Sequence, residues 1–197
     1  MEQIQNQNKL VESNKSLFIS LCKQEIEREG LDSLLAWLEK SDFYTAPASA
    51  RYHSSYEGGL VQHSLNVYIE LKNLHDVLYT HVKCTNENIA VAALFHDLCK
   101  VNFYGVEMRN RKNEEGRWEK YPAYKIQEKF CFGGHGSKSV FLIQQFMKLE
   151  PIEAVAINCH MGFSDNEYVG NAYEQYPFAW LLHVADEAAT WLVEGSK

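Results

Sequence analysis

Apolar residues recur every three or four positions along several stretches of the chain, a spacing typical of helices with one buried face. The clearest case follows Gly58-Gly59, where Leu60, His63, Val67, Leu71 and Leu74 form one stripe. We expect a helix over residues 60–78. The same argument predicts helices over residues 17–30, 34–38, 87–100, 134–146, 151–162 and 178–193.

Polar residues suggest where these helices begin. Residues 1–12 predict a frayed or weakly helical start, and Asn14 or Ser13 is the expected cap of the first helix. Asp32 is the expected cap of the second. The last helix is expected to turn Leu182, Asp186 and Val193 inward. Loops are expected at residues 41–57, which contain Pro47, and between Gly162 and Pro177, where Asp165, Asn166 and Gly170 lie.

Residues 103–130 differ from the helical pattern. Two aromatic-rich, loosely alternating runs flank Asn113-Glu114-Glu115-Gly116, and this predicts a β-hairpin inserted between helices. The insertion carries seven basic and five acidic residues. With its aromatic side chains it is either a lid that stacks a base and attracts phosphate, or a solvated hairpin that packs on the helices.

The chain is therefore predicted to be all-α, a helical bundle with a small β-hairpin insertion. A chain of 197 residues, 46% of them hydrophobic, fits a single domain spanning residues 1–197. Its parts are N-terminal helices (1–50), a helical core (51–102 and 131–194) and the inserted hairpin (103–130).

Charge and cysteine content exclude several classes. A net charge of −7 argues against a nucleic-acid coat or a membrane-surface protein. No apolar run reaches the roughly 20 residues of a membrane span. The polar N-terminus lacks the pattern of a signal peptide, and the five cysteines are scattered without a CxxC pair. We expect a reduced, cytoplasmic protein.

Histidines and aspartates on the apolar helix faces are the candidate chemistry. One inward histidine is usually an ordinary core residue, but several on separate helices are explained together by a shared cation. Imidazole and carboxylate ligands favour Mn, Fe, Co, Ni or Zn over Ca or Mg. The residues are His63, His96, Asp97, His135, His160 and Asp186.

Three motifs carry a family resemblance: Gly58-Gly59-Leu60-Val61-Gln62-His63-Ser64, Phe95-His96-Asp97-Leu98-Cys99-Lys100 and His183-Val184-Ala185-Asp186. In this order they resemble the HD-domain metal-dependent phosphohydrolase superfamily. Their context is most similar to the HD domains of 3′–5′ exoribonuclease-type proteins. The stretch before Gly58 is shorter than the OB-type nucleic-acid-binding domain of those enzymes, so we do not expect one here.

The resemblance implies roles for single residues. His63, His96, Asp97 and Asp186 match the four metal ligands of the superfamily. Members with a second ion add histidines near His135 and His160, where many have a His-His pair and this chain has His160-Met161. The number of bound divalent ions, one or two, therefore remains open.

The expected reaction is hydrolysis of a phosphate ester. A divalent ion lowers the pKa of a bound water towards about 7 and polarises a phosphoryl oxygen. Asp97 is the central ligand. Lys100 pairs with Asp97 or with phosphate, or is an ordinary lysine at a helix C-terminus. Arg51 and His53 are candidates for orienting phosphate or donating a proton to the leaving group, unless they are simply solvated loop residues.

The expected substrate is a phosphorylated small molecule, most simply a nucleotide, with nucleic acid as the less favoured ligand and no membrane partner. Monoester and diester hydrolysis both remain open, as does the oligomeric state. The alternative from another class is a non-catalytic regulatory module that binds a nucleotide or a protein partner through the same domain. Fold alone does not decide between them.

Overall fold

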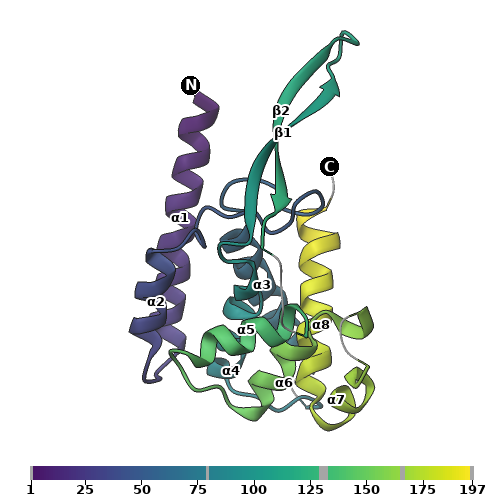
Figure 1. Cartoon of the computed structure of the whole chain (residues 1–197). Coiled ribbons are helices and arrows are strands. Elements are labelled where there is room, and N and C mark those ends of the chain that lie inside the picture. Colours follow the sequence, from purple (N-terminus) through teal and green to yellow (C-terminus); the bar gives the residue numbers. More distant parts are fainter. Residues whose placement is uncertain (1, 79, 129–132, 165–166, 196–197) are drawn as a thin grey trace.

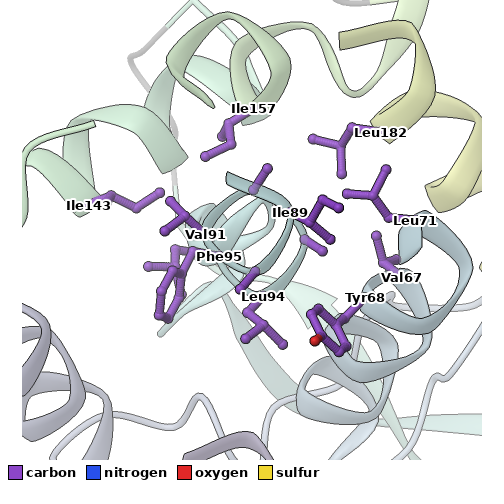
Figure 2. Packing of buried hydrophobic residues seen from close by; sticks show 14 of the residues in the cluster. Val67, Tyr68, Leu71, Ile89, Val91, Leu94, Phe95, Ile143, Ile157 and Leu182 are labelled. Carbon is purple, nitrogen blue, oxygen red and sulfur yellow. The ribbon is translucent and has the colours of Figure 1, made fainter. Parts of the chain in front are cut away.

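Helix α4 (Asn86–Phe95) lies at the centre of the structure, a computed structural model that describes residues 2–78, 80–128, 133–164 and 167–195. Every residue from Ile89 to Phe95 is buried. A helix that is apolar all round has to be enclosed on all sides. Figure 2 shows α4 surrounded by side chains of other helices, among them Leu71, Ile143 and Leu182.

The helices around α4 come from both halves of the chain. Helices α1, α3 and α6 pack directly on α4, and α8 packs on α3 and α6. The predicted all-α bundle with a small hairpin is confirmed. The elements are α1 (Glu2–Glu25), α2 (Leu31–Glu39), α3 (Gly59–Leu78), η1 (Leu98–Lys100), β1 (Tyr104–Lys112), β2 (Trp118–Ile126), α5 (His135–Gln144), α6 (Pro151–Cys159), η2 (Gly162–Ser164), α7 (Val169–Gln175), α8 (Pro177–Ala188) and η3 (Ala189–Glu194).

The N-terminal helices differ from the prediction at their ends. Helix α1 is already helical at Glu2, so the cap predicted at Asn14 or Ser13 is wrong. Asn14 lies in mid-helix, where its side chain is buried and donates to Gln62 Oε1 at 2.8 Å. Helix α2 is capped by Gly30, at φ 93°, so Asp32 falls in its first turn and is not the cap.

Later elements also differ, and helix α6 ends at Cys159 instead of Gly162. Helix α4 ends at Phe95 instead of continuing to Lys100, and the chain passes through His96 into the short 3₁₀ turn η1. Helix α5 ends at Gln144, before Phe146. The expected loop before Pro177 contains helix α7. Asp165 and Asn166, placed in that loop, lie outside the described residues.

The last helix changes its hydrogen bonding near its end. From Ala189 to Glu194 the chain is π-helical, with bonds that span five residues instead of four. This alters which side chains point inward. Val193, predicted to face the core, is 53% exposed, and that prediction is wrong. Glu194 points inward in its place.

The strands β1 and β2 form the predicted antiparallel hairpin, which projects from the helices in Figure 1. Residues 129 and 130, the last two of the predicted insertion, lie outside the described residues. Cross-strand partners share a face, and one face carries the exposed apolar residues Val106, Met108, Trp118, Pro122 and Ile126 together with the polar residues Asn110, Lys112 and Lys120. The other face carries ion pairs that join Glu107 to Arg109 and Lys125, and Arg111 to Glu119.

A buried ion pair joins the N-terminal helices to the core. Glu153, which is fully buried in α6, accepts hydrogen bonds from both Arg28 terminal nitrogens at 2.6 and 3.0 Å. It also accepts from Asn88 Nδ2 at 2.9 Å and from the backbone N–H of Glu150 at 2.8 Å. The carboxylate is therefore well supplied with donors, which offsets its desolvation.

No helix among the described residues is long and apolar enough to cross a membrane.

Candidate metal centre

Five side chains from four helices meet beside the core. His63 comes from the second turn of α3 and Asp186 from α8, while His96 and His160 cap the C-termini of α4 and α6 and Asp97 follows His96. The tight entry to α3 helps to place His63. A Cβ on Gly59 would lie 2.0 Å from the carbonyl oxygen of Ser54, so only glycine allows this approach.

The two carboxylates lie between the imidazole rings. Asp97 Oδ2 is 3.4 Å from His96 Nε2 and 3.6 Å from His63 Nε2. Its other oxygen, Oδ1, is 3.6 Å from His160 Nε2. Asp186 Oδ1 is 3.0 Å from His63 Nε2 and 3.9 Å from His96 Nε2. The structure thus brings together five of the six predicted ligands.

The orientation of the three rings matches that of metal ligands. His96 Nδ1 is 2.8 Å from the Ala93 carbonyl oxygen, and His160 Nδ1 is 2.7 Å from that of Ile157. His63 Nδ1 is 2.8 Å from a carboxylate oxygen of Glu194. These oxygens can only accept, so each neutral ring carries its proton on Nδ1 and a lone pair on Nε2.

All three Nε2 atoms are buried, and none has a hydrogen-bond partner among the residues that the structure describes. Even the 3.0 Å approach of Asp186 to His63 is out of hydrogen-bonding alignment. Buried lone pairs without donors are costly unless a cation accepts them. Within each of three overlapping sets, His63-His96-Asp97, His96-His160-Asp186 and His53-His63-Glu194, the ligand atoms lie within 4.8 Å of one another. The residues therefore fit a divalent ion.

Charges in the centre keep both aspartates ionised. Burial alone would raise the pKa of Asp97, but the Lys100 ammonium and the neighbouring histidines hold it well below its usual range. His63 does the same for the pKa of Asp186. Burial would lower the pKa of His63, but Asp186 and Glu194 raise it to about 9 in the metal-free protein, so a binding cation would displace the second ring proton from Nε2. Negative charge is thus fixed where a cation would bind.

Lys100 lies beside these ligands, in the turn η1. Its ammonium group is 2.6 Å from Asp97 Oδ2, and its side chain is 12% exposed. Burial alone would lower the pKa of Lys100, but Asp97 raises it above its usual value, so the group stays charged. Lys100 is therefore a largely buried ion-pair partner of Asp97 and not an ordinary solvated lysine at a helix C-terminus.

A cavity of about 650 Å³ opens onto the centre, with Asp186 and Lys100 in its wall. This volume is in the range of sites for small organic ligands. Arg51 and His53 both line it, Arg51 as an exposed residue and His53 with its ring centroid 4.8 Å from that of His63. Burial lowers the pKa of His53 to about 4. The aromatic residues of the wall are Tyr52, Phe103, Tyr104 and Trp191.

His135 is separate from the five converging side chains. It begins helix α5 and lines the cavity, and its Nδ1 lies 3.3 Å from Cys99 Sγ. Within the described ranges it belongs to none of the sets whose ligand atoms lie within 4.8 Å of one another. Its role as a ligand to a second ion stays a prediction.

Sequence reasoning missed Glu194, whose side chain is 3% exposed and touches His63. The residue lies among Trp191, Leu192 and Val193 near the end of the chain, where spacing alone gives no reason to turn it inward. His183, the first residue of the third motif, contacts the backbone of His160: its Nδ1 is 2.7 Å from the His160 carbonyl oxygen.

Comparison with known proteins agrees with this geometry. Residues 60–191 match the HD domain family, and the segment contains all five converging residues. The chain belongs to the HD domain family. HD domains are named for the His-Asp pair, here His96-Asp97, that the structure places at the middle of the centre.

One curated relative of this HD domain is a dihydroneopterin 2′,3′-cyclic phosphate phosphodiesterase from Methanocaldococcus jannaschii. It is 26% identical over 145 residues, which cover 73% of this chain and 51% of the relative. The chain thus spans about half the length of that enzyme. No solved structure matches the chain significantly.

Proposed function

We propose that this HD domain is a metal-dependent phosphohydrolase that cleaves a phosphate ester of a nucleotide or a related compound. The observation that carries the proposal is the convergence of three buried Nε2 atoms, from His63, His96 and His160, on the carboxylates of Asp97 and Asp186. A divalent ion bound there supplies Lewis acidity and an activated water.

The protein's own groups account for the rest of the chemistry. Asp97 and Asp186 supply the negative charge that retains the cation, and the three histidines fix its place. Lys100 lies between Asp97 and the cavity, where its ammonium group stabilises negative charge on the phosphoryl oxygens. Arg51 at the exposed rim attracts the phosphate, and His53 orients it by hydrogen bonding.

The cavity supports a substrate with a planar ring. Four aromatic side chains lie in its wall, and stacking on such rings binds flat heterocycles without hydrogen bonds. The relative's name describes a pterin compound with a cyclic phosphate, which has the same two parts. A phosphate ester of nucleotide size therefore suits the cavity: its phosphate group would lie near Lys100 and Arg51, and its ring would stack on the aromatic residues.

The first experiment is elemental analysis of untagged protein purified without chelator, followed by assays with added Mn, Co, Ni or Mg. The substrates are chromogenic phosphate monoesters and diesters, nucleoside monophosphates, nucleoside 2′,3′-cyclic phosphates and short RNA. We expect bound transition metal and metal-dependent release of phosphate or opening of the cyclic phosphate. Trimming of the RNA would extend the resemblance to exoribonuclease-type HD domains.

A negative result would favour the alternative function. Protein that holds no metal after reconstitution and cleaves none of these esters, yet binds nucleotides tightly, would be a regulatory binding module, and the proposal would be wrong.

A further inference from the structure

Glu194 is a buried carboxylate with every oxygen engaged. Oε1 is 2.8 Å from His63 Nδ1 and accepts from Asn66 Nδ2 at 3.0 Å, and Oε2 accepts from Ser54 Oγ at 2.6 Å. Three donors from a loop and helix α3 thus hold one side chain of the π-helical turn η3. Burying a carboxylate is costly, and this number of donors indicates a fixed position and not a chance contact.

The π-helical turn is what brings Glu194 to this position. Eight residues separate it from Asp186, and in a regular α-helix they would leave the two side chains about 80° apart around the axis. A π-helix turns less per residue, so Glu194 is rotated back towards the side of Asp186. The two carboxylates then reach the same imidazole, Asp186 at Nε2 and Glu194 at Nδ1.

We propose that Glu194 is a positioning residue that holds the proton of His63 on Nδ1 and directs the Nε2 lone pair at the metal centre. The inference rests on the proposed function, because it needs a metal to be bound there. A carboxylate behind a metal-binding histidine fixes its tautomer and raises its basicity. His96 and His160 rely on backbone carbonyls for the same purpose, so His63 is the ligand with a charged support.

Glu194 forms a third candidate set with His53 and His63, but its contacts argue for support of His63 and not for coordination of an ion. Both of its oxygens already accept hydrogen bonds, and its contact with His63 is on the nitrogen that faces away from Asp97 and Asp186. A cation between Glu194 and His63 would have to replace the Nδ1 proton. The 2.8 Å separation of the two atoms is that of a hydrogen bond and leaves no room for an ion.

Ser54 supports the arrangement from the other side. It adopts a left-handed backbone conformation, φ 45°, which is unfavourable for a residue with a side chain. In this conformation its hydroxyl reaches Glu194. Ser54 and Glu194 both lie outside residues 60–191, the segment that matches the HD domain family.

The test compares Glu194→Gln, Glu194→Ala and Ser54→Ala with a control, Glu174→Gln, at an exposed position of α7. Affinity for Co²⁺ and Zn²⁺ alone is measured by calorimetry or chelator competition. Histidine tautomers are read from ¹⁵N–¹H NMR of the zinc-loaded protein, and melting temperatures are measured in EDTA.

We expect Glu194→Ala to weaken metal binding by about 10–100-fold and to broaden the Nδ1–H signal of His63, because the proton loses its acceptor and exchanges faster with water. Glu194→Gln keeps the shape and an acceptor oxygen but not the charge, so it should keep the tautomer and lose less affinity. Ser54→Ala should have a smaller effect, and Glu174→Gln none.

Two failures are distinguishable. If the wild type binds metal and both Glu194 variants bind it equally well, the positioning role is wrong and the proposed function stands. If the wild type binds no metal, the proposed function itself fails. A variant that loses affinity only in proportion to a lower melting temperature in EDTA would show a purely structural role, which also overturns the inference.

Discussion

Lys100 places its ammonium group 2.6 Å from Asp97 Oδ2 and at the same time lines the cavity. We expect Lys100→Ala to lower kcat/KM by about 10²–10³-fold, as removal of one charge-stabilising group does in other enzymes. Metal content should stay unchanged, because Lys100 is not a ligand. Steady-state kinetics and elemental analysis check both points. Lys100→Arg keeps the charge and should retain more activity; loss of metal in both variants would instead assign Lys100 a structural role.

Asp97→Ala should lose both metal and activity. Its two oxygens approach His63, His96 and His160, so its removal affects every side of the centre. The control is Asp32→Ala, which removes an exposed carboxylate from the first turn of α2. Elemental analysis measures the metal content of both variants, and a phosphatase assay measures their activity. An Asp97→Ala protein with normal metal and a normal rate would show that the ligands are wrongly assigned.

His160→Ala tests the number of ions. Its Nε2 is 3.6 Å from Asp97 Oδ1, the oxygen on the other side from His63. If the centre holds two ions, the variant should lose about one per chain and keep the ion held by His63, His96 and Asp97. A wild type with one ion that survives the substitution would place His160 outside the coordination sphere. His75→Ala, at the far end of α3, is the matched control.

Metal should also stabilise the fold. An ion that binds only the native state at 100 times its dissociation constant adds about 2.7 kcal/mol to the free energy of unfolding. We therefore expect EDTA to lower the melting temperature and Mn²⁺ or Zn²⁺ to restore it. Asp97→Ala should show no such response. An unchanged melting temperature with and without saturating metal would contradict binding at this buried centre.

Glu153→Ala should reduce the free energy of unfolding by about 3–5 kcal/mol, because it leaves the Arg28 guanidinium partly buried without its main partner. The control is Glu39→Ala, which removes an exposed partner of Lys15 and should cost no more than about 1 kcal/mol. Urea denaturation measures both. Equal losses in the two variants would show that the buried pair is no more important than the exposed one.

Removal of residues 105–125 separates the two interpretations of the hairpin. Tyr104 and Ile126 are cross-strand partners, so a two-residue turn can join them. We expect the shortened protein to fold and to keep its metal, since all five converging ligands lie outside the ribbon. A higher KM for nucleotides would identify a lid that closes on substrate, and an unchanged KM would leave a solvated hairpin.

The helical core was predictable because its pattern is local. The stripe from Leu60 to Leu71 is buried as expected, with His63 on it, and the proline at residue 151 begins a helix. His96, Asp97, His160 and Asp186 could be selected as candidates because polar residues on apolar faces stand out in a sequence.

The remaining features depend on tertiary structure. Nothing in the pattern of residues 186–194 shows that the last turns become π-helical, so Val193 was placed inward and Glu194 overlooked. The cap at Gly30 was missed for a similar reason. A Cβ there would lie 1.9 Å from the carbonyl oxygen of Phe146, a distant contact that favours glycine over a side-chain cap.

The three imidazole rings are held in place by the fold itself, through Ala93, Ile157 and Glu194. An incoming ion therefore meets ligands that need no rotation, and the rate of metal uptake should depend on diffusion through the cavity beside Lys100 and Trp191. In stopped-flow experiments with Co²⁺, uptake should be a single phase whose rate rises linearly with metal concentration. Release of the ion should be slow, because every bond between the ion and its ligands has to break while the imidazole rings stay fixed in place.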